Sequence, residues 1–97
     1  MVGTVHKLDG STYAVEPANL INLCFSVLGG DPEDWAFDID SRTRFVCVHA
    51  PFSTESLNNV VTFKVGMKVR GNAIIFGYAD MVEQGYVVSP GEHEEGV

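Results

Sequence analysis

The hydrophobic pattern of the chain is dominated by the segment 20–28, where polar residues recur only at spacings of three and four. This spacing is typical of an amphipathic helix, and the polar stripe consists of Asn19, Asn22 and Ser26. Pro17 suits the first turn of such a helix, and Gly29-Gly30 suits its left-handed end. We therefore predict the main core helix at about 18–28, covered on most of its sides.

Two segments have the alternation of β-hairpins. In 2–15, β-rich flanks surround Asp9-Gly10, a dipeptide that predicts a type I′ turn. In 35–50, we place a two-residue turn at Ser41-Arg42, so that Asp40 faces Thr43 and Phe37 faces Val46. One face then carries Trp35, Phe37, Ile39, Val46 and Val48, and the other carries Ala36, Asp38, Asp40, Thr43, Phe45, Cys47 and His49. The two strands agree on which face is apolar, and we expect the helix to pack on the Trp35 face.

The second half of the chain is less regular. The segment 53–68 leaves two structures open: a short helical turn at Leu57–Val60 capped by Ser53, or a strand through Val60–Val65. Residues 69–78 predict a buried strand, with 85–89 as a shorter partner. The sequence thus predicts one α+β domain over 1–90, with one main helix on an antiparallel or mixed sheet of five to six strands. We expect 91–97 to be a mobile acidic tail.

The charge balance narrows the classes of partner. The 97 residues carry 13 acidic and 6 basic side chains, for a net charge of −7. Direct binding to nucleic acid needs a basic surface, so it is disfavoured, whereas the acidity permits a partner that is itself basic. No apolar run reaches the roughly 18 residues of a membrane span, and no signal peptide is visible. We expect a cytoplasmic protein, with Cys24 and Cys47 as free thiols. A domain this small often self-associates, so a homodimer through an edge strand is a further expectation.

The densest charge cluster lies between the predicted helix and the second hairpin. It consists of Asp31, Glu33, Asp34, Asp38 and Asp40. Three interpretations stay open: a solvated face, a site for a hard cation such as Ca²⁺ or Mg²⁺, and a patch that docks a basic protein surface. We take partner binding as the functional hypothesis for these residues.

A second candidate site is basic. Lys64, Lys68 and Arg70 would line one face of the segment 64–70 if it were extended, and an anionic nucleotide would be their ligand. A third hypothesis is an enzyme that uses Cys47 and His49 as a nucleophile and base, although that pair would also need an orienting acid. His6, His49 and His93 lack the spacing of zinc ligands, so a zinc site is disfavoured. Our prediction includes no metal and no cofactor.

Three short motifs resemble those of the DUF3846 family, small domains of unknown function common in bacteriophage and mobile-element genomes. They are Val27-Leu28-Gly29-Gly30, Leu57-Asn58-Asn59-Val60 and the strand 71–77 (Gly-Asn-Ala-Ile-Ile-Phe-Gly). The sequence differs in having Asn58 where the family usually has Pro, and in the inserted segment 31–34. The resemblance implies a phage-encoded accessory protein. Together with the acidity, it leads to the hypothesis of a non-enzymatic inhibitor that sequesters a host component, such as a defence factor.

Overall fold

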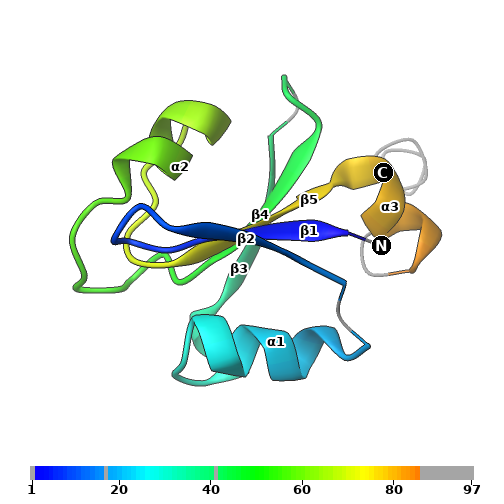
Figure 1. Ribbon diagram of the computed structural model, residues 1–97, viewed down its shortest axis with the longest axis horizontal. Helices are drawn as coiled ribbons and strands as arrows, with labels where there is room; N and C mark the ends of the chain where they lie inside the picture. The colour runs from blue at the N-terminus through cyan, green and yellow to red at the C-terminus, as the bar shows by residue number, and fades with distance from the viewer. Residues whose placement is uncertain (1, 17, 41, 86–97) are drawn as a thin grey trace, which may run out of the picture.

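In the part of the chain that the structure describes, the sheet has five strands, all antiparallel, and the fold is α+β as predicted (Figure 1). The computed structural model describes residues 2–16, 18–40 and 42–85. The strands are β1 (Gly3–His6), β2 (Thr12–Val15), β3 (Ala36–Asp40), β4 (Phe45–His49) and β5 (Ala73–Gly77). Their order is β2-β1-β5-β4-β3, so β5 is central and β2 and β3 lie at the two edges.

Helices cover both faces of this sheet. They are α1 (Leu20–Val27), α2 (Asn59–Val65) and α3 (Tyr78–Glu83), with a short 3₁₀ helix, η1 (Pro32–Asp34). Figure 1 shows α1 and α2 on opposite sides of the strands. Within the described residues the three α-helices have 8, 7 and 6 residues. The expectation of one main helix therefore does not describe this part of the chain.

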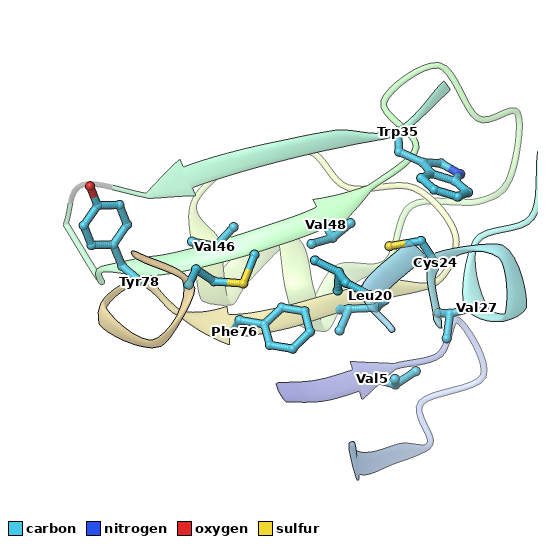
Figure 2. Close-up of a cluster of buried hydrophobic side chains, with 11 residues drawn as sticks. Val5, Leu20, Cys24, Val27, Trp35, Val46, Val48, Phe76 and Tyr78 are labelled. Atoms are coloured by element: carbon cyan, nitrogen blue, oxygen red, sulfur yellow. The ribbon is translucent and has the colours of Figure 1, made fainter. Parts of the chain in front are cut away.

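Two hydrophobic clusters follow from this layering. The larger lies under α1 and α3 (Figure 2) and contains Val5, Leu20, Cys24, Val27, Trp35, Val46, Val48, Ile74, Phe76, Tyr78 and Met81. The smaller lies under α2 and contains Cys47, Val61, Val65, Val69, Ala73 and Ile75. Successive residues of β5 enter opposite clusters, which is why that strand reads as a continuous apolar run.

The predicted packing of α1 on the Trp35 face of the sheet is confirmed. The helix begins at Leu20, because the Asn19 side chain accepts a hydrogen bond from the backbone N–H of Asn22 (3.1 Å). Only one side of the helix meets the sheet, however. Ile21 and Phe25 are 47% and 45% exposed, so the expectation that most of the helix is covered is wrong.

The first hairpin is confirmed, with β1 paired to β2, but its turn is not type I′. Only Gly10 of the two central residues has a positive φ, 94°. The Asp9 carboxylate instead accepts hydrogen bonds from the N–H (2.8 Å) and hydroxyl (2.6 Å) of Ser11. These local bonds stabilise a longer loop, closed by the Lys7 N–H donating to the Ser11 carbonyl (2.9 Å).

The second hairpin has the predicted faces in a different register. Asp40 lies opposite Phe45, and Phe37 lies opposite Val48, so the pairing is shifted by two residues and a longer loop joins Asp40 to Phe45. The Asp40 carboxylate stabilises this loop by accepting from the Arg42 N–H (3.0 Å) and the Thr43 hydroxyl (2.7 Å). An even shift preserves which side chains share a face.

The segment left open by the sequence forms α2. Its N-cap is Asn58, whose side chain accepts from the Val61 N–H (3.4 Å), so both the Ser53 cap and the extended alternative are wrong.

Another helix, α3, follows β5 directly. The neighbours of β5 among the described residues are β1 and β4. Most of the predicted strand 85–89 and the whole tail 91–97 lie outside the described residues. No helix within those described is long and apolar enough to cross a membrane.

Candidate functional site

The candidate site is built on β3, an edge strand with β4 as its one neighbour in the described sheet. Phe37 and Ile39 point to the side of the sheet that carries α1, because they pair with Val48 and Val46 of the larger cluster. They nevertheless stay 36% and 39% exposed. The helix therefore leaves this edge of its own face uncovered.

The outer side of α1 continues the uncovered apolar surface. Ile21 and Phe25 lie one helical turn apart on that side, and both are about half exposed. The Phe25 ring meets Trp35 edge to face, with ring centroids 4.9 Å apart and an interplanar angle of 78°. Trp35 immediately precedes β3. We call the resulting surface the apolar strip, defined by Ile21, Phe25, Phe37 and Ile39.

The five residues of the predicted acidic cluster do not form one group around this strip. Asp31, Glu33 and Asp34 are exposed around η1, between α1 and β3. Asp34 is partly engaged, because its carboxylate accepts a hydrogen bond from the backbone N–H of Asp31 (3.2 Å). Asp38 and Asp40 lie on the opposite face of β3 from the apolar strip. The acidic residues therefore lie in or near β3, but Asp38 and Asp40 lie on the other face of that strand from the apolar strip.

Beside η1 lies a cavity of about 370 Å³ that the sequence did not indicate. It lies where the chain leaving α1 approaches the loop between β4 and α2. Its lining residues are Leu28, Gly29, Gly30, Asp34, Ala50, Phe52, Ser53, Thr54 and Glu55. Its volume falls at the lower end of the range of small-molecule sites, about 300–1,000 Å³. We call it the acidic pocket.

The electrostatics of the acidic pocket favour a cation. Asp34 and Glu55 contribute carboxylates, and no lysine or arginine is among the described lining residues. Gly29 and Gly30 follow the C-terminal end of α1, where the helix dipole places a partial negative charge. Phe52 adds an aromatic ring that is 90% exposed, and such a ring attracts a lysine or arginine side chain. The pocket is thus suited to a basic side chain of a partner.

The pair Cys47 and His49 lies beside the orienting acid that a catalytic set would need. His49 Nε2 lies 2.6 Å from Asp38 Oδ2, and Asp38 faces Cys47 across the strand pair. Cys47 is fully buried, and burial together with the Asp38 charge raises its pKa to about 12. A thiol with this pKa stays protonated at neutral pH, so this geometry gives no support to a cysteine nucleophile.

The predicted basic stripe is not formed, because its first member lies on α2 and not on a strand. The Lys64 ammonium sits over the Phe45 ring, 5.5 Å from its centroid. Arg70 donates to the backbone carbonyl of Glu55 (3.3 Å), and Lys68 is exposed in the loop between them. These three residues do not line one face of a strand, so their binding of an anion stays a prediction.

Within the described residues, no three His, Cys, Asp or Glu side chains are placed to hold a metal ion together. Comparison of the chain with family models, curated proteins and solved structures finds no match in any of the three. The resemblance to DUF3846 therefore stays a prediction. The candidate site rests on its own geometry: the apolar strip, the acidic residues around it, and the acidic pocket.

Proposed function

We propose that this protein acts by non-enzymatic binding and that it captures a protein partner with a basic surface. The apolar strip and the acidic pocket would form the contact. From the sequence resemblance, the partner we propose is a host component, such as a defence factor, in a cell that carries a phage or mobile element.

The observation that carries this proposal is the exposure of large apolar side chains next to acidic ones. Phe25, Phe37 and Phe52 are 45%, 36% and 90% exposed, respectively. Large apolar side chains left exposed beside charged ones are typical of protein interaction sites. Glu33 and Asp34 supply the rim charge beside the strip, and aromatic residues are enriched in the energetically dominant centres of interfaces.

The test is a capture experiment from a bacterial lysate with the captured protein identified and then purified. We compare the wild-type chain with Glu33→Lys combined with Glu55→Lys, and with Phe52→Ser. Glu83→Lys is the matched control, because Glu83 is an exposed acid on α3 and lines neither the strip nor the pocket. All four substitutions change exposed residues, so folding should be preserved.

We expect the wild type and Glu83→Lys to bind the purified partner equally. The double charge reversal and Phe52→Ser should each weaken binding at least tenfold. Raising the salt concentration should weaken wild-type binding, because exposed charges are screened. Equal binding by all variants, or binding that is insensitive to salt, would overturn the proposal.

A further inference from the structure

Among the described residues no strand pairs with the outer edge of β3, and the two faces of this strand differ in chemistry. Phe37 and Ile39 present apolar side chains on one face, and Asp38 and Asp40 present carboxylates on the other. The outward backbone N–H and C=O groups of such an edge can pair with another extended chain. The alternation of apolar and acidic side chains along β3 therefore favours pairing with one type of added strand.

From this edge we infer that β3 binds an extended segment of the partner, which adds to the sheet as a sixth strand. This inference rests on the proposed function and specifies the partner's binding element. In the added strand, apolar residues would alternate with lysine or arginine. The apolar residues would lie beside Phe37 and Ile39, and the basic ones beside Asp38 and Asp40, at the close spacing of cross-strand neighbours.

The two carboxylates are already oriented by groups of their own hairpin. The Asp38 carboxylate lies 2.6 Å from His49 Nε2, and His49 is only 3% exposed, so it forms a fixed support. The Asp40 carboxylate is fixed by the Thr43 hydroxyl and the Arg42 N–H. Each carboxylate can accept about four hydrogen bonds, so both retain capacity for a basic side chain. Little ordering is left to occur on binding.

The same charges argue against a second copy of this chain as the occupant. Pairing β3 with another β3 would place an acidic strand face next to an acidic strand face, which is destabilising. The other edge strand, β2, has no charged residue among Thr12–Val15, so it offers no preference for a basic segment. The charge of β3 thus selects for a basic partner segment at that edge.

The probe for the test is a blocked ten-residue peptide in which valine and lysine alternate. One control has the same composition with all lysines at one end. A second control is the alternating peptide with N-methyl groups on alternate residues, which removes the backbone donors that strand pairing needs. Trp35 is the only tryptophan and directly precedes β3, so its fluorescence reports binding, and residue-specific amide exchange locates it.

We expect the alternating peptide to bind and to slow amide exchange on β3, with both control peptides at least about tenfold weaker. Asp38→Asn keeps an oxygen acceptor for His49 and removes the charge, and it should weaken binding about two- to fivefold, as one cross-strand ion pair would. Glu83→Gln on α3 should leave binding unchanged.

Equal binding of all three peptides would overturn strand addition, yet it would leave capture of a basic partner standing. The same holds if the alternating peptide protects the amides of β2 and not those of β3. No binding of the alternating peptide at low salt also overturns strand addition. In that case the proposed function is still tested separately, by comparing the binding of the wild type and of Phe52→Ser to the partner purified from the lysate.

Discussion

The indole N–H of Trp35 donates a 2.7 Å hydrogen bond to the carbonyl of Gly29. This bond joins the chain leaving α1 to the start of β3, and the Phe25 ring packs against the same indole. Trp35 is 9% exposed and belongs to the larger hydrophobic cluster. One side chain therefore connects the core to both sides of the candidate site.

Replacing this residue tests the connection. Trp35→Phe keeps an aromatic ring but removes the donor, so the Gly29 carbonyl loses its partner and the smaller ring fills the site less well. We expect a loss of about 1–3 kcal/mol in the free energy of unfolding, measured by urea denaturation followed by circular dichroism. The control, Phe52→Leu, changes a 90% exposed ring and should stay within about 0.5 kcal/mol of wild type. Equal stability of the two variants would contradict a structural role for the bond.

The alternation of β3 and β4 predicted the faces of the sheet correctly because side-chain direction depends only on the parity of the register. The predicted register was wrong. The observed register is set by the hydrogen bonds that the Asp40 carboxylate accepts from Arg42 and Thr43 in the loop. These bonds have no counterpart in the hydrophobic pattern. A two-residue turn and a longer loop leave the same apolar positions on the core side, so the sequence could not separate them.

The structure of α2 shows how packing overrides local propensity. The β-branched residues Val60, Val61 and Thr62 favour a strand, but in the helix Val61 and Val65 lie four apart and pack on the sheet beside Ile75.

At the candidate site, the acidic residues could be predicted from the sequence. The acidic pocket could not, because it needs the approach of Gly30 to the loop at Phe52, which only the tertiary structure provides.

Asn58 provides a second prediction because it caps α2 and also ties it to the sheet. Its side-chain amide donates to the carbonyls of His6 (3.3 Å) and Gly71 (3.0 Å), and the residue is only 4% exposed. Asn58→Ala removes the cap and both of these buried hydrogen bonds. We expect a loss of about 2–4 kcal/mol in the free energy of unfolding.

The matched control is Asn19→Ala at the N-cap of α1. Asn19 is exposed, and among the described interactions its side chain makes only the capping bond to the Asn22 N–H. This variant should lose about 0.5–2 kcal/mol. The difference between the two variants, measured by urea denaturation under one condition, reports the buried bonds of Asn58. An equal loss at both sites would show that Asn58 acts as a cap alone.

His6 predicts how stability depends on pH. It is 7% exposed on β1, and neither ring nitrogen has a hydrogen-bond partner in the described structure. Burial, with a smaller contribution from the nearby Lys64 charge, lowers the pKa of His6 below its usual 6.5. The unfolded chain therefore binds a proton at a higher pH than the folded chain. The contribution of His6 to stability is fully present above pH 6.5 and is lost as the pH falls through the lowered pKa.

The measurement is the midpoint of urea unfolding at intervals from pH 8 to pH 5, compared with His6→Gln, which does not titrate. We expect the wild-type curve to fall more steeply below pH 6.5 than the curve of the variant. Parallel curves would mean that His6 titrates alike in the folded and unfolded chains.

The two thiols provide the last prediction. Cys24 and Cys47 are both fully buried, and burial raises their pKa values to about 11 and about 12, respectively. The thiolate is the reactive form, so a thiol reagent at pH 7.5 should label the native protein slowly at both positions. We expect labelling to be roughly a hundredfold faster in urea, because modification of the folded chain requires an opening of the core.

Cys47→Ala and Cys24→Ala variants assign the labelling rates to each site. Asp38→Asn sharpens the comparison, since the Asp38 carboxylate contributes to the raised pKa of Cys47 but does not act on Cys24. Removing that charge should speed native labelling of Cys47 modestly and leave Cys24 unchanged. Rapid labelling of Cys47 in the native wild-type chain would contradict the sheltered thiol of the structure. It would also revive the hypothesis that Cys47, His49 and Asp38 act together as a catalytic set, because only an accessible thiolate can serve as the nucleophile.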